Sequence, residues 1–299
     1  MSTEASLQEK RQGWLQQRRT GIGGSDAAAV LGANPWKSRL ELWAEKRGLV
    51  ESPELDSEAV QWGLKLEGIV LEELARRTGR RVERHPQFEI LRHPEYTWMI
   101  CTPDAFQYDP QLGRGVVQAK TTSAFQRKEW EGQEPPLHYQ VQIQHEMLVT
   151  GCTWGTLCCL IGGQKFAWFD VELNRRFVSA LIEKEREFWQ QVQEGVQPEP
   201  DGTESCARAL AKLYPEETGE SVALPPEFLQ YDEQLLEINQ RIKALQEQKR
   251  ELENRFKAAI GPHALGVLPD GTVYTYRTVQ RKEYTVKATK YRVLRRAKG

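Results

Sequence analysis

The sequence predicts an α/β fold, in which a central mixed sheet is flanked by helices and followed by a long C-terminal helix with a small β and basic tail. Two observations lead to this class. Up to about residue 195, segments with apolar residues at helical spacing alternate with short segments typical of strands. Beyond them, apolar residues recur every three or four positions from Phe228 to Phe256, which is the pattern of a heptad seam.

The first eighty residues are expected to be helical apart from one turn. The first twenty residues form a helix, and a glycine-rich turn at residues 21–24 leads to Ser25, which we expect to cap a short helix through Leu31. A third helix is expected at residues 38–46 and a fourth at residues 57–77. The apolar stripe of the fourth helix consists of Val60, Leu64, Leu71 and Leu74. Glu67 falls within this stripe, and an inward carboxylate needs a cation, a donor or a metal as partner.

The sheet is expected to come from the middle of the chain. Strands are expected near residues 81–90, 98–101 and 115–119, with a turn at residues 109–113. A helix at residues 137–150 follows, then a hairpin of residues 153–161 and 165–171, then a helix from Asn174 to Val192. Asp104 and Lys120 therefore lie on two strands that we expect to pair.

The chain is expected to divide into a core at residues 1–196, a linker with a short helical piece at residues 197–225, and an arm at residues 226–299. The heptad seam of the arm is interrupted by Lys249, which disfavours a long, tightly closed dimer. A hairpin is expected at residues 264–277, and the stretch from Ala264 to Gly299 has nine Lys or Arg against two Asp or Glu. This basic end either contacts phosphates or is a solvated tail.

Composition excludes several protein classes. The chain has 41 Lys and Arg against 42 Asp and Glu, which argues against coating nucleic acid by bulk charge. Its five cysteines show no paired C-x-x-C spacing, so a zinc site or redox dithiol is not expected. It has neither a long apolar stretch nor a signal-peptide core, and we expect a cytoplasmic protein with no membrane partner.

Asp104 and Lys120 indicate metal-dependent phosphodiester cleavage. The carboxylate suits a divalent cation, and the lysine suits a role in positioning or deprotonating the attacking water. Gln118 stands where such a site should have a second carboxylate. Taken alone, each residue has an ordinary explanation: a turn aspartate, a solvated lysine, or, for Ser25, a helix cap.

The motifs together resemble the phage-type (YqaJ-like) exonucleases, which are relatives of lambda exonuclease in the PD-(D/E)xK nuclease superfamily with its restriction-endonuclease-like core. The resemblance covers residues 10–195 and rests on motifs in one unbroken order: Arg18-x6-Ser25-Asp26 with Ile22-Gly-Gly24, Leu31-Gly-x-x-Pro35, Gly63-x-x-x-Glu67, Pro103-Asp104 and Gln118-x-Lys120. Each motif is weak alone, and the combination is specific.

The resemblance implies a 5′-to-3′ exonuclease that uses Mg²⁺, with Mn²⁺ as the alternative cation, to resect double-stranded DNA ends for a phage single-strand annealing protein. It also implies a ring-shaped trimer and a bacterial host cell. The implied roles fall on eight residues: Glu67, Asp104 and Gln118 at the metal, Lys120 as catalytic lysine, Arg18 and Ser25 at the 5′ phosphate, and Tyr139 and Gln142 on the helix that completes the site.

Gln118 departs from the family pattern, because a neutral amide binds a cation more weakly than a carboxylate. Two interpretations remain open. Glutamine was introduced in place of a natural glutamate to silence the enzyme, which the intact remainder of the site slightly favours, or the chain is a natural Gln-x-Lys variant. The alternative functions are an endonuclease on the same core and a catalytically inactive module that binds DNA ends.

Overall fold

The computed structural model describes residues 3–51, 58–283 and 288–296, and it divides into two units, Met1–Pro215 and Glu216–Gly299. The helices of the first unit are α1 (Thr3–Arg18), α2 (Gly24–Val30), α3 (Arg39–Lys46), α4 (Glu58–Thr78), the 3-10 helix η1 (Ala124–Trp130), α5 (Leu137–Thr150), α6 (Arg175–Glu194) and α7 (Glu204–Leu213). Its strands are β1 (Arg81–Arg84), β2 (Leu91–Arg92), β3 (Ile100–Cys101), β4 (Ala105–Asp109), β5 (Gly113–Thr122), β6 (Trp154–Ile161) and β7 (Lys165–Glu172).

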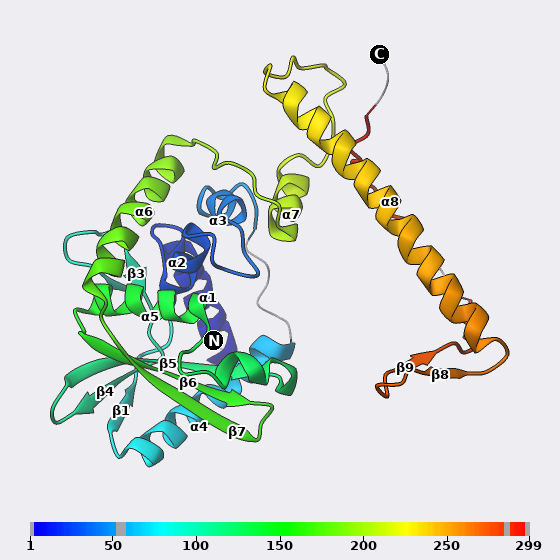
Figure 1. Ribbon diagram of the computed structural model, residues 1–299. Coiled ribbons are helices and arrows are strands. Elements are labelled where there is room, and N and C mark those ends of the chain that lie inside the picture. The colour runs from blue at the N-terminus through cyan, green and yellow to red at the C-terminus, as the bar shows by residue number, and fades with distance from the viewer. Residues whose placement is uncertain (1–2, 52–57, 284–287, 297–299) are drawn as a thin grey trace. The chain divides into compact units, whose positions relative to one another are not determined.

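A five-stranded mixed sheet forms the centre of the first unit. The strand order is β1-β4-β5-β6-β7, and only the β5–β6 pair is parallel. Helix α4 lies on one face of this sheet and α5 on the other, with α2 and α6 outside α5 (Figure 1). The predicted mixed sheet between helices is therefore confirmed.

The two faces of β5 have different neighbours. Val117 packs with Val70 and Leu71 of α4, whereas Val116 packs with Ile143 and Met147 of α5. Because successive side chains of a strand point to opposite faces, Gln118 and Lys120 share the α5 face with Val116. The Gln118-x-Lys120 motif thus faces α5, and α4 lies on the other face of the strand.

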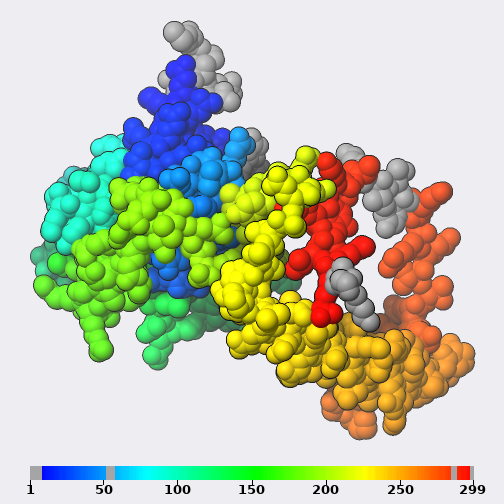
Figure 2. Space-filling model, turned by 90° about the horizontal axis from the view of Figure 1, so that it is seen from above, coloured from blue at the N-terminus to red at the C-terminus, as the bar shows by residue number. Residues whose placement is uncertain are grey.

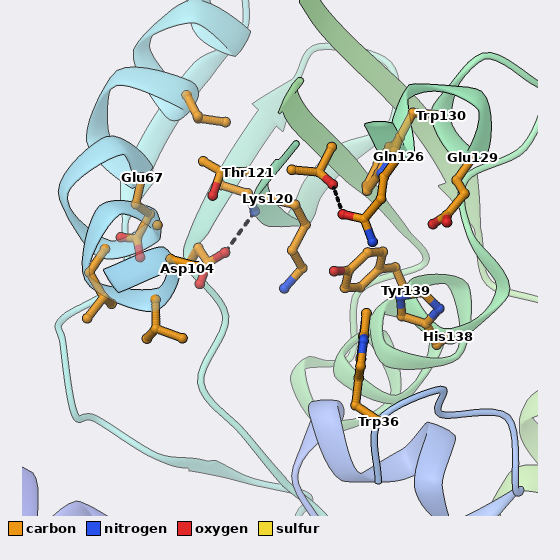
Figure 3. A pocket seen from close by; sticks show the side chains of 17 residues that line it. Trp36, Glu67, Asp104, Lys120, Thr121, Gln126, Glu129, Trp130, His138 and Tyr139 are labelled. Carbon is orange, nitrogen blue, oxygen red and sulfur yellow. Dashed lines mark hydrogen bonds between the residues drawn. The ribbon is translucent and has the colours of Figure 1, made fainter. Parts of the chain in front are cut away.

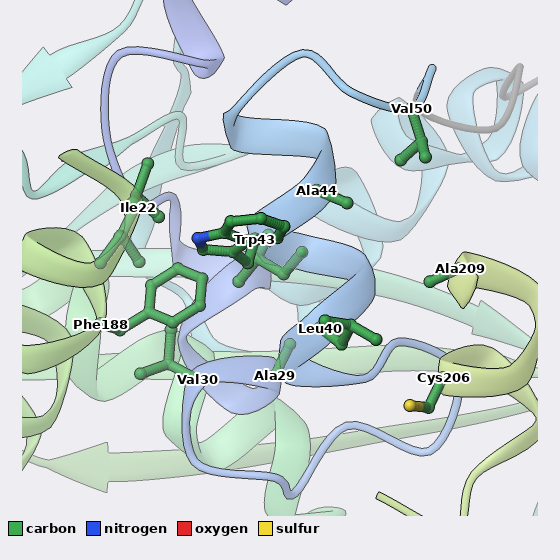
Figure 4. Close-up of a cluster of buried hydrophobic side chains, with 12 residues drawn as sticks. Ile22, Ala29, Val30, Leu40, Trp43, Ala44, Val50, Phe188, Cys206 and Ala209 are labelled. Carbon is green, nitrogen blue, oxygen red and sulfur yellow. The ribbon is translucent and has the colours of Figure 1, made fainter. Parts of the chain in front are cut away.

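The largest hydrophobic cluster lies beyond α5 and holds the N-terminal helices in place (Figure 4). Phe188 of α6 and Trp43 of α3 are at its centre, with Ile22 beside them, and all three are buried. Cys206 and Ala209 of α7 complete the cluster. The segment that carries Arg18 and Ser25 is therefore fixed by a packed core.

Three details of the sequence prediction are wrong. Ser25 does not cap α2: Gly23 is the N-cap residue, and its N–H donates to Asp26 Oδ2 at 3.0 Å. Asp104 does not end the strand that precedes it but stands directly before β4, a strand that was not predicted. Leu64 is 54% exposed, because the buried face of α4 begins at Val70.

The second unit contains α8 (Phe228–Ile260) and the hairpin of β8 (Leu265–Val267) and β9 (Val273–Thr275), which confirms the predicted long helix and hairpin. Figure 2 shows α8 as a continuous rod in yellow and orange. Arg296 forms an ion pair with Asp232 near the start of α8, and most of the apolar seam remains exposed. No helix in the described part of the chain is long and apolar enough to cross a bilayer.

Candidate functional site

Two cavities meet at Asp104 and Lys120. The smaller cavity, about 180 Å³, is lined by Trp14, Arg18, Gly23, Gly24, Ser25, Ile90, Ile100, Cys101, Thr102, Asp104, Gln118, Lys120, Gln142 and Glu146. The larger, about 660 Å³, is lined among others by Trp36, Glu67, Asp104, Lys120, Gln126, Trp130, His138 and Tyr139 (Figure 3). All eight predicted site residues therefore line one or both cavities.

Asp104 is positioned by the pairing of β4 with β5. Its Oδ2 accepts a hydrogen bond of 2.7 Å from the backbone N–H of Ala119 on the neighbouring strand. Desolvation by the surrounding protein raises the pKa of Asp104 to about 6; Lys120 opposes this shift, and Glu67 adds to it. A carboxylate whose charge is only partly compensated by the protein favours the binding of a cation.

Gln118 and Lys120 lie side by side on β5, as their spacing of two predicts. The Nζ of Lys120 donates a hydrogen bond of 2.8 Å to Oε1 of Gln118. Gln118 is 1% exposed, whereas Lys120 reaches into the larger cavity between Asp104 and Tyr139 (Figure 3). The ammonium lies 5.1 Å from the ring centre of Tyr139. This lysine is thus held at the point where the two cavities meet.

Arg18 and Ser25 lie side by side in the lining of the smaller cavity. Nη2 of Arg18 donates to Oγ of Ser25 at 2.8 Å, and the guanidinium lies over the ring of Trp14. A guanidinium beside a hydroxyl can bind a terminal phosphate through several hydrogen bonds. The structure therefore brings these two residues, predicted to contact the 5′ phosphate, to one wall of the cavity.

A buried ion pair supports this wall. Nζ of Lys46 donates to Oδ2 of Asp26 at 2.6 Å and to the carbonyl oxygen of Arg18 at 2.8 Å. Burial alone would raise the pKa of Asp26, but Lys46 and Arg18 overcome this effect and hold that pKa well below the usual range. Asp26 is therefore ionised and links α3 to the turn before α2.

Glu67 approaches from α4, behind the β5 face that carries Gln118. Its Oε1 accepts a hydrogen bond of 2.7 Å from Nη2 of Arg84, and the glutamate is half-buried at the edge of the larger cavity (Figure 3). The inward carboxylate that the sequence indicated thus has a cationic partner. It is not in the smaller cavity with Gln118.

Sequence reasoning missed Glu146, which lies on α5 and lines the smaller cavity. Gln142 donates a hydrogen bond of 2.9 Å to its Oε1. The signal was available, because Glu146 follows Gln142 by four residues on a predicted helix and so belongs to the same face. Trp36, which forms an edge-on contact with the ring of His138, was not assigned to the site either.

The oxygen ligands around Asp104 suit a hard divalent cation such as Mg²⁺. No three carboxylate, imidazole or thiol groups in the described ranges lie close enough to bind a metal by themselves. A buried carboxylate oxygen in the smaller cavity, Oε2 of Glu146, has no hydrogen-bond partner among the described residues. The smaller cavity therefore offers oxygen atoms from two acids, Asp104 and Glu146, and from the neutral amide of Gln118, whereas Glu67 lines only the larger cavity.

Comparison with known proteins agrees with this architecture. The YqaJ-like viral recombinase domain matches residues 13–153. An uncharacterised protein YqaJ of Bacillus subtilis is 39% identical over 251 residues, which span 83% of this chain and 77% of that protein. The alkaline exonuclease LHK-Exo of Laribacter hongkongensis, crystallised with dAMP, superposes with a TM-score of 0.52 at 19% identity, over 68% of this chain and all of that one. The chain thus shares the fold of this exonuclease, in agreement with the α/β class predicted from the sequence.

Proposed function

Since the chain belongs to the YqaJ-like viral recombinase domain family, we propose that it is a metal-dependent nuclease that resects double-stranded DNA from its 5′ ends. One observation carries this proposal. Arg18 and Ser25 line the same small cavity as Asp104 and Lys120. A binding place for a terminal phosphate thus lies beside the residues suited to phosphodiester hydrolysis.

The position of each residue in the two cavities supports a separate role in this reaction. Arg18 and Ser25 bind the 5′ phosphate and set the position of the strand, while Tyr139 and Trp36 give the larger cavity aromatic surfaces on which bases stack. Lys120 orients or deprotonates the attacking water and stabilises charge on the phosphate. Mg²⁺, or Mn²⁺, bound through Asp104 would supply the Lewis acid for this hydrolysis.

The match to a viral recombinase domain supports a role of this activity in phage-type recombination. We propose that resection leaves a 3′ overhang for a single-strand annealing protein in the cytoplasm of a bacterial host. For this activity we propose that three copies of the chain form a ring-shaped trimer around the duplex. The exposed apolar residues of α8 are a separate surface for contacts with a copy or a partner. Light scattering with and without DNA tests the trimer.

The direct test is digestion of a 5′-phosphorylated linear duplex with Mg²⁺, beside a covalently closed circle and a sample with EDTA. We expect loss of the linear DNA only, and none in EDTA. Nicking of the circle would indicate an endonuclease instead. Binding of DNA ends without cleavage in Mg²⁺ or Mn²⁺, by this chain and by its Gln118→Glu variant, would reject the enzyme and leave an end-binding module, the function that Gln118 alone suggests.

A further inference from the structure

Glu146 is a buried acid with an unused oxygen. It lies on α5 and is 1% exposed. Its Oε1 accepts the hydrogen bond from Gln142, while Oε2 has no hydrogen-bond partner in the described part of the chain. Burying a polar atom without a partner costs free energy, so an orphaned carboxylate oxygen in a cavity indicates a missing ligand.

The position of Glu146 relates it to Gln118. Both residues line the smaller cavity, together with Asp104 and Lys120. Gln118 points to the α5 face of the sheet and Glu146 comes from α5 itself, whereas Glu67 approaches from the opposite face. Glu146 is therefore the acid on the same side of the sheet as position 118.

The surroundings of Glu146 leave room for its side chain. A Cβ atom placed on Gly24 would lie 2.6 Å from Oε1 of Glu146, so the absence of a side chain at residue 24 lets the carboxylate reach the cavity. Gly24, Glu146 and Asp104 line the same cavity, so this close approach keeps the Glu146 carboxyl group beside Asp104.

We propose that Glu146 supplies the negative charge that Gln118 lacks, and that with Asp104 it binds the divalent cation of the site. The inference rests on the proposed nuclease function. If Glu146 has this role, the Gln-x-Lys motif belongs to an active site in which the second acid comes from a helix and not from the strand. Lys120 remains bonded to Gln118 and keeps its position.

A four-member set of full-length proteins tests this exchange of acids: the unchanged chain, Glu146→Gln, Gln118→Glu and the double variant. Calorimetric titration with Mn²⁺ measures cation affinity, and digestion of linear duplex measures activity. Glu146→Gln should weaken Mn²⁺ binding by about tenfold or more and slow cleavage in parallel. In the double variant, Gln118→Glu should restore both Mn²⁺ affinity and cleavage. As a single change, Gln118→Glu should alter them little.

Glu172→Gln is the matched control, because Glu172 is exposed, lines neither cavity and carries the same charge. Circular dichroism checks the fold of each variant. Glutamine at position 146 can still accept the hydrogen bond from Gln142, and Glu146→Met provides a second uncharged variant of similar length.

The outcomes separate the two proposals. Unchanged Mn²⁺ affinity and cleavage in folded Glu146→Gln would overturn the role of Glu146 while leaving the nuclease standing. An inactive chain that gains cleavage from Gln118→Glu alone would also overturn it and mark Gln118 as a silencing change. The expected Mn²⁺ pattern without cleavage by any member would reject the nuclease and keep the cation site. If no member either bound Mn²⁺ or cleaved DNA, both proposals would fail.

Discussion

Replacing Asp26 by asparagine should destabilise the first unit by about 3 to 5 kcal/mol, because it leaves a buried lysine without its anion. Asp26 is 3% exposed, and the side chain of Lys46 is 5% exposed, so solvent cannot replace the lost carboxylate. Asparagine is isosteric and can still accept the hydrogen bond from Gly23. The loss of stability therefore measures the effect of removing the Asp26 charge and not the loss of the hydrogen bond at the N-cap.

Urea unfolding at pH 7 measures this effect. All nine tryptophans precede residue 216, so their fluorescence follows the first unit alone. With a denaturant slope of about 3 kcal/mol per molar, the midpoint should fall by about 1 to 1.7 M. Because the pKa of Asp26 is lowered by folding, its contribution is present above the unfolded pKa and fades as the pH falls below about 4.

The partner variant Lys46→Met provides the control. Asp26→Asn leaves the buried Lys46 without an anion, and Lys46→Met leaves Asp26 with only its longer ion pair to Arg18, at 3.6 Å. The double variant Asp26→Asn, Lys46→Met removes both buried charges, so its loss should be smaller than the sum by at least about 1 kcal/mol. Strictly additive losses, or a loss below about 1 kcal/mol in Asp26→Asn, would refute the reasoning.

Three further results are expected. Asp104→Asn should stabilise the metal-free protein by up to about 3 kcal/mol at pH 8 and by nothing below pH 4: folding raises this pKa, so the native state binds more protons between those values and its stability falls as pH rises. Thermal unfolding in EDTA checks this, and equal gains at both pH values would contradict it. Lys120→Met should slow cleavage by about 10² or more while end binding, followed by fluorescence anisotropy, persists; retention of a tenth of the rate would count against a catalytic lysine. Arg18→Met should reduce the preference for 5′-phosphorylated over 5′-hydroxyl ends by about tenfold, while Arg19→Met, outside the smaller cavity, should not. Equal losses in the two arginine variants would show that only overall charge matters.

Local signals predicted much of the fold. Helix α5 has the predicted bounds, because prolines precede it and Gly151 adopts the left-handed conformation that ends it. The spacing of Gln118 and Lys120 placed them on one strand face without further information. Strand β4 was missed because the residues from Trp98 to Asp104 read as one extended strand.

What the sequence could not show depends on contacts between distant segments. The N-cap of α2 is Gly23 and not the predicted Ser25, because the Asp26 carboxylate, held by Lys46, accepts a hydrogen bond from the N–H of Gly23. Glu146 read as an ordinary polar residue of a helix. Glu146 is buried because α2, which comes about 120 residues earlier in the chain, packs against α5. The sequence around Glu146 places it on the Gln142 face of the helix but does not show this contact.

The close approach of Gly24 to Glu146 has an evolutionary consequence. Gly24 is required by volume and not by a left-handed backbone, since its φ is not positive. A side chain at position 24 would therefore displace the carboxyl group of residue 146 or require a shorter residue there, and a carboxylate at position 118 would then keep the same charge in the cavity. Among relatives, positions 24, 118 and 146 should vary together: glycine and glutamine with glutamate on the helix, or glutamate on the strand with a small residue on the helix.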